Sequence, residues 1–281
     1  MEHFETHRSL LFAIAYRMLG SAMDAEDMVQ ETYLRYQSVP TDSIQSPKAF
    51  LTTIITRLCV NQLNSARAQR ESYIGPWLPE PLLTPEMPVL AQNAEESISM
   101  AFLVLLETLT PVERAVFLLR EIFDYEYAEI AEIVSKDETT CRQLFSRARK
   151  HIAENRPRFK TSQETHRQML DRFMGAISDG ELDGLMQLLS QDVTMWADGG
   201  GKARGAATRP LIGREAVARF LLASTQFLSQ PFAAEIADVN GEPAAILRIA
   251  GQPFVVLFIA VAQDNVSEIR VIGNPDKLGH V

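Results

Sequence analysis

The sequence predicts a multidomain protein with two all-α domains followed by an α+β domain. Apolar residues recur at helical spacing through most of the first 156 residues, a proline-rich stretch interrupts them, and strand patterns dominate only after residue 190. We therefore divide the 281 residues into helical domains at 1–72 and 99–156, a linker at 73–98, and a C-terminal domain at 163–281.

Charge is unevenly distributed along the chain. The formal net charge of −9 argues against a nucleic-acid partner when it is taken alone. However, residues 71–113 contain seven Glu and no Lys or Arg, whereas residues 135–160 contain eight Lys or Arg and three acids. The local field governs attraction to phosphate more than the net charge does. The stretch 135–160 is therefore a candidate nucleic-acid contact.

Several kinds of site and location are not expected. Cys59 and Cys141 have no spacing typical of a metal site or a disulfide framework, and both are expected to be small core residues. We expect neither a metal nor a cofactor. Residues 1–5 lack the pattern of a signal peptide, and no apolar run approaches the roughly 18 residues of a membrane span. The sequence thus predicts a cytoplasmic protein with no membrane contact.

Two helices are predicted before residue 40. The first spans 7–19 and can end at Gly20, and the second starts near Asp24. Four polar side chains lie on or near the outside of the second helix: Asp24, Asp27, Gln30 and Glu31. Acids in a first turn suit the helix dipole, so the simpler interpretation is a well-formed helix start. The alternative is an acidic docking face for a basic partner.

A long helix is predicted after Pro47, since proline suits a first-turn position. No acidic residue occurs between Asp42 and Glu71. The polar faces of this helix carry, among others, Asn61, Asn64 and Arg67. Such side chains suit the bases and phosphates of an opened DNA strand, although an isolated helix of this kind is more often plain surface.

The second domain is predicted to contain four helices. Residues 99–106 are largely apolar, which indicates a buried helix. Residues 110–113, Thr-Pro-Val-Glu, have the form of a capping box with proline at the first helical position. Residues 127–152 then form two amphipathic helices separated by a short break. Asp137 or Ser135 in this break can cap the second helix. This is the pattern of a DNA-binding helix-turn-helix.

The second helix of this pair has a polar, cationic outer face. Its candidate DNA-contacting residues are Thr139, Arg142, Gln143, Ser146, Arg147 and Lys150. Arg and Gln can read base edges, while Lys can neutralise phosphates. The alternative is a solvated face on an ordinary helical bundle, because a single pattern of this kind is only moderately specific.

Several short motifs together resemble those of an extracytoplasmic-function (ECF) sigma factor. They are Asp24–Thr32, Pro47–Leu51 followed by Arg57-Leu58, Leu109–Arg114, Tyr127–Ile133 and Ser146–Lys150. The resemblance covers nearly all of residues 1–155. It implies a protein that directs core RNA polymerase to promoter DNA for transcription initiation.

The resemblance also implies a role for each helical face. The helix from Asp24 would bind the clamp helices of polymerase, and the helix after Pro47 would melt and read the minus-ten element. The helix after Asp137 would lie in the major groove of the minus-thirty-five element. Thr140 and Arg142 occupy the places where the family has a hydroxyl and a cation. Gln143 stands where serine is common, so the promoter sequence cannot be copied from relatives.

The linker is rich in proline, and all its charges are acidic. Proline removes backbone donors and fixes an extended backbone, so a semi-rigid connector is predicted. Trp77 lies between Pro76 and Pro79. A large aromatic on an extended segment prefers to be covered, and we therefore expect Trp77 to dock against a protein surface.

The C-terminal domain is predicted to start with helices and to end with strands. Helices are predicted at 169–177, 182–189 and 213–228, and a strand is predicted at 193–197, between the second and third helices. Four strands follow, at 232–239, 244–249, 254–262 and 266–272. This order predicts an α+β cone with one sheet wrapped on its helices. It resembles the SnoaL-like, nuclear-transport-factor-like superfamily, which encloses a pocket with room for an unknown small ligand.

Two further motifs, with the Trp77 segment, resemble signatures of the sigma-factor group that carries this extra domain. They are Asp198-Gly199-Gly200-Gly201-Lys202 and Asn274-Pro275-Asp276-Lys277-Leu278. The resemblance implies that the domain modulates sigma activity from within the same chain. Three glycines let a partner approach closely, and Asp198 and Lys202 can fix it by charge. The alternative interpretation of the glycines is a loose loop.

Catalysis is not expected in the C-terminal domain. Superfamily cyclases and epoxide hydrolases use Asp, His or Arg in the pocket, whereas His166 and His280 lie near the ends of this domain and Asp198 has no evident partner base. Two alternatives stay open: a one-component helix-turn-helix regulator with a ligand-sensing domain, and a SnoaL-like cyclase or hydrolase. We predict instead a sigma factor, not an enzyme, whose C-terminal domain docks Trp77 and holds the two helical domains close together.

Overall fold

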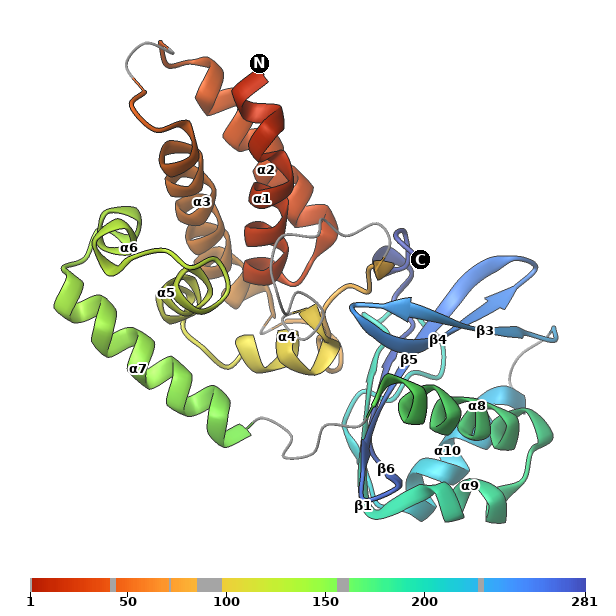
Figure 1. Cartoon of the computed structure of the whole chain (residues 1–281). Coiled ribbons are helices and arrows are strands. Elements are labelled where there is room, and N and C mark those ends of the chain that lie inside the picture. The colour runs from red at the N-terminus through yellow and green to blue at the C-terminus, as the bar shows by residue number, and fades with distance from the viewer. Residues whose placement is uncertain (1, 41–43, 71, 85–97, 156–161, 227–229) are drawn as a thin grey trace. The chain divides into compact units, whose positions relative to one another are not determined.

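The computed structural model describes the chain except residues 1, 41–43, 71, 85–97, 156–161 and 227–229, and the side chains of residues 2–3 and 66–70. It divides into two compact units, residues 1–71 with 86–156, and residues 72–85 with 157–281. The first unit is helical and the second combines helices with a sheet (Figure 1). The beginning of the linker thus belongs to the same unit as the C-terminal domain.

Three helices form the N-terminal part of the first unit: α1 (Glu2–Leu19), α2 (Ala22–Gln37) and α3 (Pro47–Arg70). Ser21 caps α2 by accepting a hydrogen bond from the backbone N–H of Asp24 at 3.1 Å. Apolar faces of all three helices meet in a core that includes Leu11, Ile55 and Cys59, each with no exposed surface.

Four further helices complete the first unit: α4 (Met100–Leu106), α5 (Pro111–Glu121), α6 (Tyr127–Val134) and α7 (Glu138–Asn155). The predicted capping box is present, because the N–H of Glu113 donates to the Thr110 hydroxyl and the N–H of Thr110 donates to the Glu113 carboxylate. Asp137 caps α7 by accepting from the N–H of Thr140 at 2.8 Å. The predicted helix-turn-helix therefore corresponds to α6 and α7.

One buried arginine ties the two halves of this unit together. Arg114 on α5 is 3% exposed, and its guanidinium donates to the backbone carbonyl of Met18 at 2.6 Å and to the Glu107 carboxylate at 2.7 Å. Burial lowers the pKa of Arg114 to about 10, so the side chain still carries its charge at neutral pH. Arg114 thus joins the last turn of α1 to α5.

The second unit begins with α8 (Gln163–Asp179) and α9 (Leu182–Leu188), followed by β1 (Leu189–Asp198), β2 (Leu211–Ile212) and α10 (Arg214–Gln226). Strands β3 (Ala233–Val239), β4 (Glu242–Ile249), β5 (Gln252–Ala262) and β6 (Asn265–Ile272) follow, and a short 3-10 helix spans Pro275–Lys277. The sheet order is β2-β1-β6-β5-β4-β3. The expected α+β domain is confirmed, with α8, α9 and α10 covering one face of the sheet (Figure 1).

The sheet is mixed, a feature that the sequence patterns did not predict. β3 to β6 form an antiparallel run, but β1 pairs in parallel with β6. Parallel neighbours require a long crossover, which α10 and β3–β5 supply here. The register places Asp198 opposite Ile272, so the segments that follow β1 and β6 leave the sheet side by side. β2 was not predicted because two residues show no pattern.

The core of this domain lies between its helices and the concave face of the sheet. It is built from Phe173, Leu185, Val217, Leu257 and Ile269, with other apolar residues of the same elements. In the described part of the chain, no helix combines the length and apolar character that crossing a membrane requires.

Replacing Arg114 with alanine should destabilise the first unit by about 3 kcal/mol, because the carbonyl of Met18 and the half-buried Glu107 carboxylate would both lose the donor that Arg114 supplies. Urea unfolding of the full chain, followed by helical circular dichroism, measures the change. Arg8→Ala is the matched control, because its ion pair with Glu26 is exposed and should contribute less than about 1 kcal/mol. Equal effects of the two substitutions would contradict this role of Arg114.

Candidate functional site

Three segments that are far apart in the sequence meet at Asp198, the last residue of β1. Its carboxylate has no exposed surface. One oxygen accepts from the Tyr73 hydroxyl at 2.5 Å, and the other accepts from the backbone N–H of Leu78 at 2.8 Å and from Lys277 Nζ at 2.7 Å. Asp198 therefore binds the start of the linker and the C-terminal motif at once.

Lys277 completes this buried cluster. It is 8% exposed, and its ammonium group also donates to the backbone carbonyl of Leu78 at 2.5 Å. The same group lies 4.1 Å from the centre of the Trp77 ring and 5.3 Å from that of Tyr73, which are cation–π distances. Burial, followed by the hydrogen bond to Asp198, raises the pKa of Tyr73. The phenol therefore stays protonated and acts as a donor.

The glycine loop after Asp198 allows the linker to approach closely. Gly200 and Gly201 have φ angles of +57° and +72°, a region that favours glycine. A Cβ on Gly201 would lie 2.8 Å from the end of the Ile74 side chain, and one on Gly200 would overlap the Asn274 amide. The close approach favours the docking interpretation of these glycines over a loose loop.

Asn274 connects the C-terminal motif to Tyr73 of the linker and to Asp198 at the end of β1. Its side-chain amide donates to the Tyr73 hydroxyl at 2.9 Å, and its backbone N–H donates to the carbonyl of Asp198 at 2.9 Å. Lys202, expected to fix a partner by charge, forms an exposed ion pair with Asp276 instead. This pair links the two motifs, and such exposed pairs contribute little to stability.

A second anchor holds the linker further along. The buried side chain of Asn240 accepts from the N–H of Leu82 at 3.0 Å, and its backbone N–H donates to the carbonyl of Leu82 at 2.9 Å. The N–H of Gly241 donates to the Thr84 hydroxyl at 2.9 Å. Residues 78–82 are buried, and Trp77 is half-buried. The expected docking of the Trp77 segment on the C-terminal domain is therefore observed.

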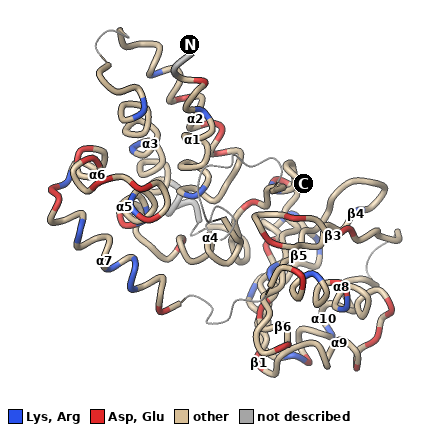
Figure 2. Tube along the Cα trace, in the orientation of Figure 1, with Lys and Arg blue, Asp and Glu red and all other residues tan. Residues whose placement is uncertain are grey.

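The outer face of α7 is solvent-exposed. Exposed side chains there are Thr139, Arg142, Gln143, Ser146, Arg147 and Lys150, while Thr140 is half-buried. Figure 2 shows Lys and Arg spaced along this helix. Three of these cations also have an acidic neighbour: Arg142 pairs with Glu138 at 2.9 Å, Arg147 with Glu113 at 3.3 Å and Lys150 with Glu154 at 3.8 Å. Among the described residues, none forms a hydrogen bond with the side chain of Gln143 or Ser146.

Comparison with known proteins identifies both halves of the first unit. The sigma-70 region 2 model matches residues 3–69, and the sigma-70 region 4 model matches residues 99–152. The ECF RNA polymerase sigma factor SigJ of Mycobacterium tuberculosis is 38% identical over 292 aligned residues, which cover 99% of this chain and 92% of SigJ. The chain belongs to the ECF sigma factors.

Two further similarities extend along the whole sigma factor. The probable ECF sigma factor SigI of Mycobacterium tuberculosis is 31% identical over 98% of this chain and 93% of its own length. The crystal structure of Mycobacterium tuberculosis SigJ superposes with a TM-score of 0.76 at 36% identity, covering 98% of this chain and 97% of that chain. The protein is thus a sigma factor that directs core RNA polymerase to promoters.

The remaining predicted residues lie in region 2 of this sigma factor. On α3, Asn61 and Asn64 are exposed, whereas the side chain of Arg67 falls outside the described part. On α2, Asp27 and Gln30 are exposed, and Asp24 and Glu31 are partly exposed. Glu31 also pairs with Arg35 at 2.8 Å. The described residues of both faces are therefore accessible in the first unit.

Regions 2 and 4 of the sigma factor contact each other directly. Arg57 on α3 donates to the backbone carbonyls of Glu132 and Ile133, both at 2.8 Å, and to the Ser135 hydroxyl at 3.0 Å. The hydroxyls of Thr52 and Tyr125 form a buried hydrogen bond of 2.8 Å. We expected the C-terminal domain to hold these two regions together, but contacts within the first unit already do so.

Replacing Asp198 with asparagine should release the linker, because buried Lys277 would lose its counter-ion at a cost of about 3 kcal/mol. In a Trp196→Phe background, where Trp77 is the remaining tryptophan, its emission should shift to longer wavelength and iodide quenching should increase. Asp238→Asn is the control, because Asp238 pairs with Arg167 on the exposed surface of the same domain. An unchanged Trp77 signal in Asp198→Asn would contradict the anchor role.

Proposed function

We propose that this sigma factor is regulated in cis by its C-terminal domain, which binds the linker between regions 2 and 4. The observation that carries the proposal is the buried Asp198–Lys277 pair, which binds both the N–H and the carbonyl of Leu78. A surface loop that merely connected two domains would not need a desolvated ion pair. The Asp198–Lys277 pair binds the linker, and the linker limits how far regions 2 and 4 can separate.

The need for separation follows from the promoter. Elements named for positions −10 and −35 lie about 25 base pairs apart, or about 85 Å at roughly 3.4 Å per base pair. The Arg57 contact holds region 2 against region 4 and is incompatible with that distance. With residues 72–84 bound to the C-terminal domain, this part of the linker cannot extend between the two regions. Docking of the linker therefore favours the closed arrangement.

Each exposed face then has a role in the open complex. We infer that α2 binds polymerase through Asp24, Asp27, Gln30 and Glu31, because acids on an accessible helix suit a basic partner. The melted minus-ten strand would contact Asn61, Asn64 and Arg67 on α3. The minus-thirty-five duplex would contact Thr139, Thr140, Arg142, Gln143, Ser146, Arg147 and Lys150 on α7. Gln143 is the best candidate for base recognition, since its amide is exposed and has no described partner.

The C-terminal domain, on this proposal, catalyses no reaction. Asp198, the one acid that the sequence singled out, is fully buried and accepts three hydrogen bonds from Tyr73, Leu78 and Lys277. A carboxylate engaged in this way is a poor general base, because proton transfer would leave Lys277 as an uncompensated buried charge. This disfavours the cyclase or hydrolase alternative. Membership of the sigma family disfavours the one-component regulator, which has no use for α2. The cytoplasmic location stays a prediction.

Truncating the chain after Lys160 should change promoter activity several-fold, because it removes the domain that holds the linker. Run-off transcription with purified core polymerase measures the effect on the full-length and truncated proteins. Deleting residues 274–278 removes Lys277 and leaves Asp198, its buried partner, in place. This deletion should change promoter activity in the same direction as the truncation. Identical transcription from all three proteins would refute regulation in cis while leaving the sigma-factor function intact.

Substitutions on α7 should separate base reading from phosphate attraction. Gln143→Ala should weaken binding to the cognate minus-thirty-five element by about 1–3 kcal/mol, with little effect on unrelated duplex. Lys150→Ala should weaken both equally and reduce the salt dependence by about one phosphate contact. Fluorescence anisotropy over a salt series with polymerase holoenzyme measures both. A sequence-independent loss in Gln143→Ala would contradict its role as a base reader.

A further inference from the structure

The C-terminal domain contains a cavity beside the buried pair of Asp198 and Lys277. It lies between α8, α10 and the concave face of the sheet, and its volume is about 400 Å³. Cavities of roughly 300–1,000 Å³ are typical of small-molecule sites. One wall is the loop 202–206, which follows the glycines of the anchor.

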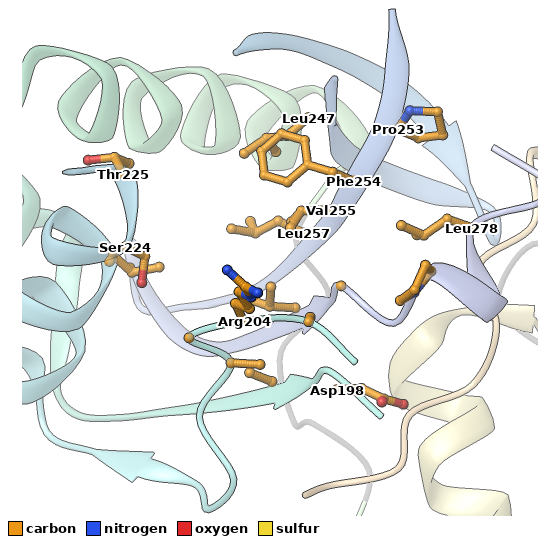
Figure 3. Close-up of a pocket in the computed structure, with 18 of the residues that line it drawn as sticks. Asp198, Arg204, Ser224, Thr225, Leu247, Pro253, Phe254, Val255, Leu257 and Leu278 are labelled. Carbon is orange, nitrogen blue, oxygen red and sulfur yellow. The ribbon is translucent and has the colours of Figure 1, made fainter. Parts of the chain in front are cut away.

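The walls of this cavity are mainly apolar. Figure 3 shows Leu247, Phe254, Val255 and Leu257 facing its interior, and Phe220 and Leu221 of α10 also line it. An occupant therefore needs an apolar body, because such walls offer no partners to polar groups, whose desolvation would cost free energy.

The charged side chains that line the cavity differ in whether they already have a partner of opposite charge. Asp198, Lys202 and Arg204 line it. Asp198 is neutralised by Lys277 and directs its carboxylate away from Arg204 (Figure 3), and Lys202 pairs with Asp276. Arg204 has no ion pair or hydrogen bond with any residue that the structure describes, and it is an exposed residue of the cavity lining (Figure 3). Among the described residues it is therefore the one cation of this lining that is not already paired with a carboxylate.

Arg204 indicates the chemistry of the occupant's polar group. A guanidinium presents donors in a planar fork that matches a carboxylate. Two hydroxyls on α10 lie at the same cavity, and both already donate to helix carbonyls, Ser224 to Phe220 at 2.7 Å and Thr225 to Leu222 at 2.8 Å. They can still accept a hydrogen bond but have no proton left to offer an anion. With a single available cation, a singly charged group suits this site better than a phosphate.

We propose that the cavity binds a small carboxylic acid with an apolar body, whose carboxylate pairs with Arg204. Asp198, Pro275 and Leu278 belong both to the cavity lining and to the motifs that hold the linker. The cavity is formed with the linker docked, so a ligand that fits it stabilises the docked state by its difference in affinity for the two states. This regulatory consequence, unlike binding itself, rests on the proposed function.

Binding is tested on the full chain without polymerase or DNA, so that its failure is distinguishable from failure of the regulatory proposal. Isothermal titration calorimetry at pH 7.5 compares decanoate with decan-1-ol, which has the same apolar chain and no charge. Decanoate should bind one site per chain, at least about tenfold more tightly than decan-1-ol. Arg204→Gln should abolish that preference and leave binding of decan-1-ol unchanged.

Two variants complete the design. Arg209→Gln removes an exposed arginine that does not line the cavity and should bind both probes as the parent does. Ser224→Leu fills the cavity from a helical position and should weaken both probes at least about tenfold. Absence of binding, equal affinity for decanoate and decan-1-ol, or unchanged binding by Ser224→Leu would each overturn the proposal. In the Trp196→Phe background, decanoate should also reduce iodide quenching of Trp77.

Discussion

The buried pair of Asp198 and Lys277 is the interaction on which the second unit depends. It joins residues 79 positions apart in the sequence, and through Tyr73 it reaches a residue 125 positions from Asp198. A buried ion pair adds little net stability, since desolvation offsets most of the attraction, but the loss of one partner is costly. The pair therefore selects one arrangement of three segments, and every other arrangement leaves a desolvated charge without its partner.

Proline makes the linker suited to this kind of binding. The prolines at 76, 79 and 81 have no N–H to satisfy and restrict the backbone before it docks, which lowers the entropy lost on docking. The amides of Leu78 and Leu82 find acceptors in Asp198 and Asn240. In the first unit, Arg57 likewise binds backbone carbonyls at the end of α6. Both sets of contacts recognise main-chain groups with one or two side chains, so each can be broken without unfolding a domain.

Local chemistry made much of the fold predictable. The capping box at Thr110 and the cap at Asp137 satisfy backbone groups within three residues, so sequence spacing alone indicates them. The helix-turn-helix, the order of the C-terminal elements and the docking of Trp77 followed from periodicity and from the cost of exposing a large aromatic side chain. The region 2 and region 4 matches then confirmed the family resemblance.

The partners within the site could not be predicted in the same way. Asp198 and Lys202 were expected to act together, but Lys277 neutralises Asp198 because β1 pairs in parallel with β6 and brings the two strand ends together. Nothing in the strand patterns indicates that pairing. Asn240 lies in the turn between β3 and β4, and no sequence pattern indicates that its side chain also binds Leu82. Contacts of this kind depend on closure of the whole sheet, which no short stretch of sequence encodes.

The docked linker and the domain that binds it are parts of one polypeptide. Their encounter is intramolecular, with an effective concentration set by chain geometry and, for short flexible connections, in the millimolar range. A separate binding protein can be diluted, degraded or outnumbered, whereas this domain is synthesised in a fixed one-to-one ratio with the linker that it binds. Raising the expression of the protein therefore leaves the fraction of molecules with a docked linker unchanged, and only an event that alters the contact itself can shift this fraction.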